Sequence, residues 1–345
     1  MKKISIFLAA IVFGFAFFLT GCGGKNNTIK VNEVTHSVFY APLYIAINKG
    51  YFEEEGLKIE LTNGGGADKV MSALTSKSAD IGLMGPEASV YVVKQGKKDL
   101  PVVFGQLTKR DGSFLIGRKN IENFTVSNIT GGRAEIAENE RPVILAGRKG
   151  GVPAMTLAYM LKENGLIDGK NITLRYDVPF DSMTAAFIGN VGDYVTAFEP
   201  AASAIVNEGK GYNLASVGSL SGEIPYTAFT ANESYIKKNP DKINKFLRAI
   251  IKGYNYLTTA NVDEVVTALE PSFKGISKES LKAALEAYIR IDAWSNNLMM
   301  TEVSYNRLLD IIIDNGVLTE RVEFNKVVNN SYAEKAYNEI KAENK

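Results

Sequence analysis

Cysteine, histidine and tryptophan are nearly absent from this sequence of 345 residues, since each occurs only once, as Cys22, His36 and Trp294. One thiol and one imidazole exclude an internal disulfide, an HExxH zinc site and any histidine- or cysteine-rich metal cluster. No GxxxxGK[ST] phosphate loop or dinucleotide fingerprint is present. We therefore expect no metal, no cofactor and no catalytic residue. Chemistry by a pair of carboxylates is the one enzymatic alternative left open, because acidic residues are plentiful.

An excess of charge of one sign is also lacking. The chain has 39 Lys and Arg against 38 Asp and Glu, and removal of residues 1–21 would leave 37 basic against 38 acidic side chains. A chain with so balanced a charge lacks the excess of basic residues that is typical of nucleic-acid-binding proteins. The hydrophobic fraction of 46% is that of an ordinary globular protein, and the length suits two domains.

The longest apolar run, residues 4–18, follows Lys2 and Lys3 and ends shortly before Leu-Thr-Gly-Cys at 19–22. It is too short and wrongly flanked for a membrane span, so it predicts a secretory signal. The motif at 19–22 looks like the lipobox of bacterial lipoproteins; the alternative is a chance cysteine after an ordinary signal. We expect cleavage after residue 21, acylation of Cys22, a tether at 22–28, and a lipid-anchored protein on the extracytoplasmic face of the cell membrane.

From residue 29 onward, short apolar runs alternate with helical patterns. We expect strands at 29–35, 58–62, 80–84, 102–107, 113–118, 143–146, 171–178, 194–198 and 226–231, with helices after 41, 67, 86, 153 and 200. Such alternation predicts parallel βαβ units and an α/β fold. Beyond residue 231 the chain reads as almost wholly helical.

Two α/β lobes joined by two connections account for this pattern. Lobe one comprises residues 29–115 and 227–345, with C-terminal helices packed on it, and lobe two comprises 116–226. The chain would pass between the lobes around 113–118 and 223–231, which are the expected hinges.

Several motifs together resemble one known family. They are Thr-His-Ser-Val-Phe-Tyr-Ala-Pro at 35–42, Ala-Ile-Asn-Lys-Gly-Tyr-Phe at 46–52, Glu-Gly-Leu at 55–57, Asp-Ile-Gly at 80–82, Gly-Gly-Val-Pro at 150–153, Gly-Asp-Tyr at 192–194 and Phe-Glu-Pro at 198–200. The sequence is similar to the ABC-transporter solute-binding proteins for nitrate, taurine, aliphatic sulfonates and thiamine pyrimidine precursors, over about residues 29–335. The resemblance implies a type II periplasmic-binding-protein fold, no catalysis, and delivery of a small molecule to a permease with its ATPase subunits. We expect a monomer. The stretch 120–141 departs from the family pattern; it would line the cleft or decorate lobe two, and we favour decoration.

The residues expected to bind the ligand lie in loops at the carboxyl ends of strands, where clefts form in such folds. Aromatic side chains can stack on a ring, glycines before a helix let the backbone approach an anion, and a carboxylate accepts hydrogen bonds from an amino group. The candidates are His36, Phe39, Tyr40, Gly65, Gly66, Ala67, Pro86, Glu87, Gly150, Gly151, Val152, Phe198, Glu199 and Tyr226.

These candidates favour two different ligands. The glycine-rich helix starts suit an anion such as a sulfonate, taurine or nitrate, whereas Glu199 with the aromatic residues suits a nitrogen-bearing ring such as an aminopyrimidine. We favour the second. A further alternative is an enzyme of thiamine-precursor synthesis on the same scaffold, against which the single histidine and the signal sequence both argue.

Overall fold

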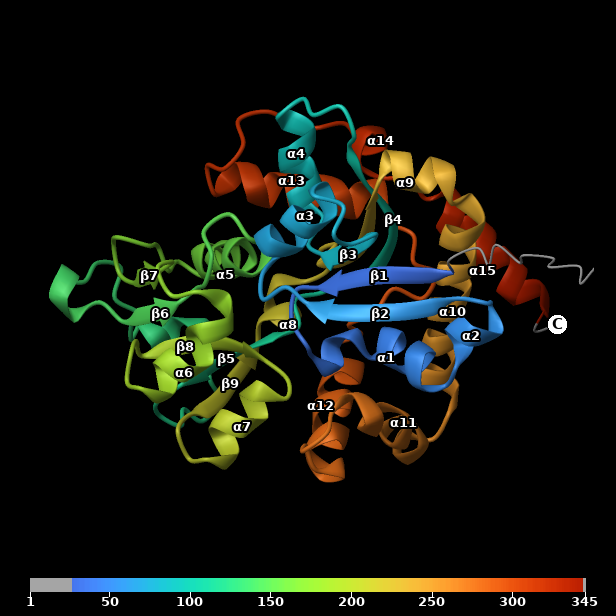
Figure 1. Ribbon diagram of the computed structural model, residues 1–345. Helices are drawn as coiled ribbons and strands as arrows, with labels where there is room; N and C mark the ends of the chain where they lie inside the picture. Colours follow the sequence, from blue (N-terminus) through green and yellow to red (C-terminus); the bar gives the residue numbers. More distant parts are fainter. Residues whose placement is uncertain (1–26, 344–345) are drawn as a thin grey trace, which may run out of the picture.

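The computed structural model describes residues 27–343, which form two α/β lobes, each built around a five-stranded sheet (Figure 1). The predicted signal, Cys22 and most of the predicted tether lie outside the described residues. Within residues 27–343, no helix is long and apolar enough to cross a membrane.

The sheet of lobe one has the strand order β2-β1-β3-β10-β4. Its strands are β1 (Thr28–Glu33), β2 (Lys58–Asn63), β3 (Ile81–Met84), β4 (Pro101–Thr108) and β10 (Thr227–Asn232). β1 pairs in parallel with β2 and β3, whereas β10 runs antiparallel to β3 and β4. Every residue of β3 and β10 is buried, as expected for central strands covered on both faces.

Helices cover both faces of this sheet (Figure 1). In lobe one they are α1 (Ala41–Asn48), α2 (Tyr51–Glu54), α3 (Ala67–Thr75), α4 (Glu87–Lys94), α9 (Glu233–Lys238), α10 (Pro240–Thr259), α11 (Val262–Leu269), α12 (Lys278–Arg290), α13 (Glu302–Asp314), α14 (Phe324–Val327) and α15 (Ser331–Glu343). The longest, α10, buries an apolar face against α1 and α15. The C-terminal helices therefore pack on lobe one, as expected.

The sheet of lobe two has the order β7-β6-β8-β5-β9. Its strands are β5 (Ser113–Gly117), β6 (Val143–Leu145), β7 (Thr173–Arg175), β8 (Tyr194–Phe198) and β9 (Tyr212–Ser216), and its helices are α5 (Val152–Glu163), α6 (Met183–Ile188), α7 (Ala201–Asn207) and α8 (Val217–Ser221). β6 is parallel to β7 and β8, and β5 is antiparallel to β8 and β9.

The two crossings between the lobes are short. β5 pairs within the lobe-two sheet from Ser113 onward and β10 within the lobe-one sheet from Thr227 onward, so the chain crosses at 109–112 and at 222–226. The expected hinges at 113–118 and 223–231 therefore include residues of β5 and β10 that are paired within a sheet. The first crossing precedes the boundary expected at 115–116 by a few residues.

The segment 120–141 forms the outer end of lobe two, at the left edge of Figure 1. It contains two 3₁₀ turns, η2 (Val126–Ile129) and η3 (Glu138–Glu140). Val126 and Ile129 are buried in the cluster that also holds residues of α5 and β6. No residue of this segment lines either of the cavities described below. This placement agrees with decoration of lobe two.

Candidate functional site

Two adjacent cavities lie between the lobes. The first cavity has a volume of about 240 Å³ and is lined from lobe one by the loop before α3 and the start of α4, and from lobe two by the loop before α5 and the loop after β7. Its lining residues are Val34, Gly65, Gly66, Ala67, Asp68, Lys69, Glu87, Arg148, Gly151, Pro153, Ala154, Tyr176, Asp177, Val178, Pro179 and Phe180. Loops at the carboxyl ends of strands β2, β3, β6 and β7 thus converge on one space.

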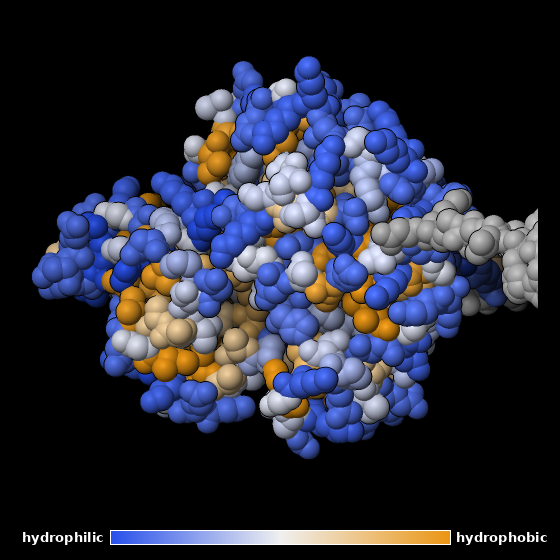
Figure 2. All heavy atoms as spheres, in the orientation of Figure 1, coloured by the Kyte–Doolittle hydropathy of each residue, from blue (hydrophilic) through white to orange (hydrophobic). Residues whose placement is uncertain are grey.

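The second cavity, of about 150 Å³, is lined by Thr35, His36, Ser37, Phe180, Asp181, Met183, Thr184, Thr196, Ala197, Phe198, Glu199, Pro200 and Ala201. Phe180 lines both cavities and therefore separates them. Figure 2 shows hydrophobic residues gathered over α6 and its surroundings in lobe two, with smaller hydrophobic patches on the face of lobe one that is in view.

Glu87 begins α4 and is the most deeply buried ionisable group of the first cavity, with a side chain only 1% exposed. Its Oε1 accepts a hydrogen bond from the backbone N–H of Val152 at 3.4 Å and lies 3.6 Å from Nη2 of Arg148. Its Oε2 has no hydrogen-bond partner among the described residues. Burial raises the pKa of Glu87 to about 7, although the positive charge of Arg148 and the Val152 N–H oppose the shift.

Arg148 reaches from lobe two to two carboxylates of lobe one. Its Nε lies 3.6 Å from Oδ1 of Asp68, at about the same distance as its Nη2 from Glu87. Gly147 and Gly150, with φ of 77° and 79°, let the loop turn in the left-handed region on either side of Arg148 and Lys149. A second pair across the lobes joins Lys69 to Asp181 at 3.6 Å. Both basic side chains that line the first cavity therefore already face carboxylates.

Glu199 directly follows β8, and it is buried against the second cavity. Its Oε2 accepts a hydrogen bond from the N–H of Ser203 at 3.0 Å, and its backbone oxygen accepts one from Oγ of Ser37 in lobe one at 2.5 Å. Its own N–H donates to the hydroxyl of Tyr288 at 2.8 Å. Burial raises the pKa of Glu199. The same residue thus lines the second cavity and holds the two lobes together.

His36 also lines the second cavity, but both ring nitrogens have partners within lobe one. Nδ1 lies 2.9 Å from a carboxylate oxygen of Glu33, and Nε2 lies 2.7 Å from the backbone oxygen of Ser272. A carbonyl only accepts, so Nε2 carries the proton of that bond. The bond to Glu33 raises the pKa of His36 above its ordinary value. Its hydrogen bonds therefore fix the cleft loop to the connection between α11 and α12.

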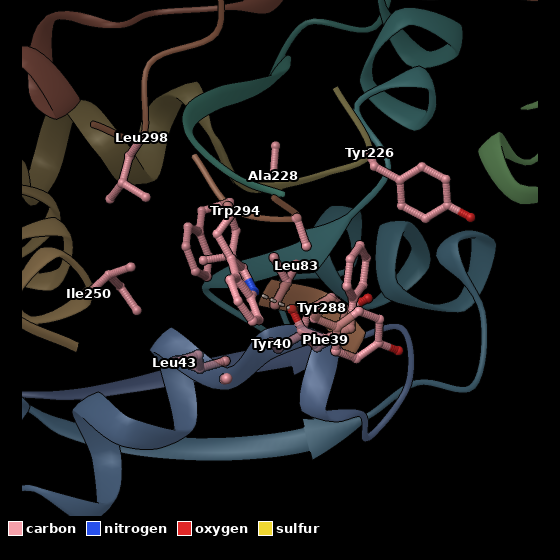
Figure 3. Packing of buried hydrophobic residues seen from close by; sticks show 14 of the residues in the cluster. Phe39, Tyr40, Leu43, Leu83, Tyr226, Ala228, Ile250, Tyr288, Trp294 and Leu298 are labelled. Atoms are coloured by element: carbon pink, nitrogen blue, oxygen red, sulfur yellow. Dashed lines mark hydrogen bonds between the residues drawn. The ribbon is translucent and has the colours of Figure 1, made fainter. Parts of the chain in front are cut away.

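Phe39, Tyr40 and Tyr226 are buried and line neither cavity; Figure 3 shows them among the packed aromatic side chains. Phe39 is wholly buried, with ring centroids 5.6 Å from Phe198 of lobe two and 5.1 Å from Tyr288. Figure 3 shows Tyr226 at the edge of this cluster, with its hydroxyl pointing away from it. These aromatic residues pack the lobes together where the crossings lie.

The structure gathers part of the predicted set in the cavities. Gly65, Gly66, Ala67, Glu87 and Gly151 line the first cavity, and His36, Phe198 and Glu199 line the second. The other predicted residues, which line neither cavity, are Phe39, Tyr40, Pro86, Gly150, Val152 and Tyr226. Gly150 and Val152 instead make contacts across the lobes: the oxygen of Gly150 accepts from the hydroxyl of Tyr91 at 2.8 Å, and Val152 donates to Glu87.

The loop 176–181 was missed as a cavity wall. It brings Tyr176, Asp177 and Phe180 to the first cavity and Asp181 to the second. The strand predicted at 171–178 ends at Arg175 in the structure, so the first half of this loop was predicted as strand. The end of that strand was the available signal, because loops at carboxyl strand ends face the cleft in this kind of fold. Within residues 27–343, no group of three or more His, Cys, Asp or Glu side chains is placed to hold a metal ion.

Comparisons with known proteins agree with the fold. The model of the NMT1-like family matches residues 33–270. "Putative binding protein YtlA" of Bacillus subtilis is 37% identical over 325 residues, covering 94% of each chain. A 4-amino-5-hydroxymethyl-2-methylpyrimidine phosphate synthase of Aspergillus parasiticus is 23% identical over 67% of each chain. The solved periplasmic nitrate-binding protein NrtA of Synechocystis superposes with a TM-score of 0.74 at 19% identity, over 92% of this chain and 89% of NrtA. The expected type II periplasmic-binding-protein fold is confirmed.

Proposed function

Because this chain belongs to the NMT1-like family, we propose that it is the solute-binding component of an ABC importer. It captures a small organic molecule between its two lobes and presents the closed form to a permease that is driven by ATPase subunits. The observation that carries this proposal is that both cavities lie between the lobes and take their walls from both. A solute in them would contact both lobes and favour closure.

The two lobes already meet through polar contacts that opening must break. They include the Ser37–Glu199 and Tyr91–Gly150 hydrogen bonds and the Lys69–Asp181 ion pair. Near Tyr91, whose hydroxyl also lies 3.6 Å from Sδ of Met155, Nδ2 of Asn315, after α13, donates to the backbone oxygen of Met155 in α5 at 3.4 Å. We propose that a bound solute adds to these contacts and shifts the population toward the closed form.

For the solute itself we propose a nitrogen-bearing ring, such as an aminopyrimidine. Tyr176 and Phe180 provide aromatic surfaces, and Glu87 and Glu199 provide buried carboxylates that accept hydrogen bonds from amino groups. The alternative is a sulfonate, taurine or nitrate-type anion bound at the glycine-rich turn before α3. The carboxylates disfavour that alternative because they would repel an oxyanion.

The enzymatic alternative has a specific point of support, the pyrimidine phosphate synthase among the relatives. In this chain, however, the single imidazole is occupied at both nitrogens by Glu33 and Ser272. A general acid or base needs a proton site free to reach the substrate. We therefore propose transport rather than catalysis, carried out by a monomer held at the extracytoplasmic face of the membrane through acylated Cys22.

The test is mass spectrometry of small molecules released from residues 23–345 after gentle purification from cells grown in the native medium. We expect one compound in stoichiometric amount, and we expect it to raise the melting temperature of protein stripped by unfolding and refolding. The matched comparison is a thermal-shift panel of aminopyrimidines and sulfonates. Stabilisation by sulfonates alone would refute the ring assignment. Protein that carries no solute and turns over a pyrimidine precursor would refute the transport role.

A further inference from the structure

Two ion pairs join the lobes beside the first cavity, and they run in opposite senses. Lobe one supplies neighbouring residues of opposite charge, Asp68 and Lys69, in the first two turns of α3. Lobe two supplies Arg148, whose Nε lies 3.6 Å from Oδ1 of Asp68. It also supplies Asp181, in the 3₁₀ turn η4 (Phe180–Ser182), whose Oδ2 lies 3.6 Å from Nζ of Lys69. Each lobe therefore contributes one positive and one negative group, and the set carries no net charge.

These four side chains, hereafter the rim charges, lie at the opening of the space between the lobes. Asp68, Lys69 and Arg148 line the first cavity, and Asp181 lines the second. Their side chains are nevertheless between 37% and 58% exposed. A side chain that borders a cavity and also reaches solvent stands at the edge of that cavity. Because each pair spans the two lobes, neither pair can persist when the lobes separate at this edge.

Glycines in the cleft loops leave room for both pairs. At Gly65, whose φ is 69°, a Cβ would lie 3.3 Å from Oδ2 of Asp181 and 3.4 Å from Nζ of Lys69. At Gly151, a Cβ would lie 3.3 Å from Nη2 of Arg148. Side chains at these two positions would therefore crowd the pairs. The glycine-rich helix starts, which the sequence analysis associated with an anion, thus serve the contact between the lobes.

A charged solute in the first cavity would have to compete with these pairs. An anion would draw a basic side chain away from its carboxylate, and a cation would draw a carboxylate away from its base. Asp177, another exposed carboxylate of this cavity, already contacts Arg175 at 2.5 Å. An uncharged solute leaves the pairs intact and can pack on the neutral walls, which include Tyr176 and Phe180.

We propose that the rim charges form an ionic gate, which closes over the first cavity after an uncharged solute has entered. This inference rests on the proposed function, because it states what holds the captured solute and which chemical class the closed cleft accepts: a small, uncharged ring compound. Exposed ion pairs are weak, and each should change the ratio of closed to open protein by only about 1.5- to 5-fold. Pairs of this strength favour closure and still allow the gate to reopen.

The test measures the distance between the lobes directly. Residues 23–345 contain no cysteine, so Ser72→Cys in α3 and Ala185→Cys in α6, both at exposed positions, can carry two spin labels. Double electron–electron resonance then gives the closed-to-open ratio of solute-stripped protein. We expect Lys69→Asp to lower this ratio by about 1.5- to 5-fold or more, because two carboxylates then face each other. Lys69→Asp combined with Asp181→Lys should restore the ratio, because the pair forms again with its charges exchanged.

Three further measurements accompany the exchange of charges. Lys58→Asp makes the same change at an exposed position of β2 outside both cavities and should behave like the wild type. Raising the salt concentration from about 0.05 to 0.5 M should lower the wild-type ratio, because salt screens exposed charges. The compound released from protein purified from native medium should carry no charged group at pH 7. Its affinity should fall in Lys69→Asp and recover in the double variant, because a smaller closed population weakens binding.

The outcomes separate this inference from the proposed function. The gate is overturned if Lys69→Asp changes neither the ratio nor the affinity, if the double variant stays as open as the single variant, or if salt has no effect. A released compound that is an anion or a cation overturns the assigned class of solute. The transport proposal still stands if that compound binds the stripped protein and brings the labels together. It fails if no compound is released or binds, whereas the ratio in stripped protein still judges the gate.

Discussion

At the scale of single residues, Glu87 makes the stability of the protein depend on pH. Its pKa is about 7 in the folded protein and near 4.5 in an unfolded chain, so between these values the folded state binds the additional proton. Stability linked to this group is therefore greatest below pH 4.5 and is lost as the pH rises through 7. Ionisation of the buried Glu87 carboxyl therefore lowers the stability of the folded protein.

Glu87→Gln should therefore stabilise the protein at pH 8, by up to about 3.5 kcal/mol, because the pKa rises from 4.5 to about 7 and each pKa unit corresponds to about 1.4 kcal/mol. The advantage should disappear near pH 5, where the wild-type carboxyl is neutral. Urea unfolding of both proteins at the two pH values measures this. Asp111→Asn is a useful comparison, because burial raises the pKa of Asp111 to about 7 as well. If Glu87→Gln lowers stability equally at both pH values, burial of the ionised carboxylate does not destabilise the folded protein, and the prediction is wrong.

Sequence reasoning found the residue types of the site better than their positions. Glu87 and Glu199 were predicted from their places at strand ends, and both line a cavity. Tyr40 and Tyr226 were predicted by the same reasoning, but they are buried among other aromatic side chains and line neither cavity. Whether an aromatic side chain faces the solute or the other lobe depends on the lobe geometry, which the sequence does not express.

At the scale of elements, the packing of α10 on α1 depends on a missing side chain. A Cβ at Gly253 would lie 2.2 Å from the backbone oxygen of Pro42 and 3.2 Å from the nitrogen of Ala46. α1 and α10 are among the most closely associated elements of lobe one. A glycine inside a helix costs up to about 1 kcal/mol relative to alanine, and here it permits the close approach.

Gly253→Ala should consequently destabilise lobe one, by about 1–3 kcal/mol, despite its better helix propensity. The clash is with backbone atoms, which cannot move without separating the two helices. Chemical denaturation measures the loss, and Thr258→Ala on the exposed side of the same helix serves as the control. A stabilised Gly253→Ala would mean that the two helices are free to separate at little cost.

The sequence predicted most elements correctly because their signals are local. Buried strands such as 81–84 and 194–198 read as apolar runs, and helix starts are indicated by Pro42, Pro86 and Pro153. β9 was missed because it is a half-exposed edge strand without a continuous apolar pattern. The segment 120–141 gave no periodic signal either, since 3₁₀ turns and a few buried side chains hold it in place.

At the scale of the whole molecule, the proposed function requires the lobes to move apart. The crossings at 109–112 and 222–226 are short; the first joins strands β4 and β5, and the second joins helix α8 to strand β10. Motion is therefore confined to a few residues, and the lobes should move as rigid bodies.

Small-angle X-ray scattering should show that stripped protein is more extended than protein with the recovered solute, and that addition of the solute lowers the radius of gyration. The contacts across the cleft set the balance, so Ser37→Ala, which removes the hydrogen bond to Glu199, should shift the stripped protein further toward the open form. A variant on the outer face, Glu60→Gln, should scatter like the wild type. An unchanged radius of gyration on solute addition would contradict closure.

The sequence analysis assigned the strand from residue 227 to lobe one but divided the strand at 113–118 between the two lobes. Only the pairing of Ser113–Gly117 with β8 and β9 shows that this whole strand belongs to the sheet of lobe two. Such pairings join residues more than 80 positions apart in the chain, such as Ser113 with Phe198. Local patterns carry no information at that separation.

The central place of β10 has a consequence for the order in which the protein can be assembled. β10 lies between β3 and β4, yet it follows the whole of lobe two in the chain. In a chain that folds as it emerges from its N-terminus, β3 and β4 must wait with unpaired edges until Thr227 appears, whereas lobe two can complete its sheet first. The inserted lobe is thus finished before the lobe that encloses it. During that interval the exposed strand edges of lobe one are the part of the chain most prone to pair wrongly with a neighbour.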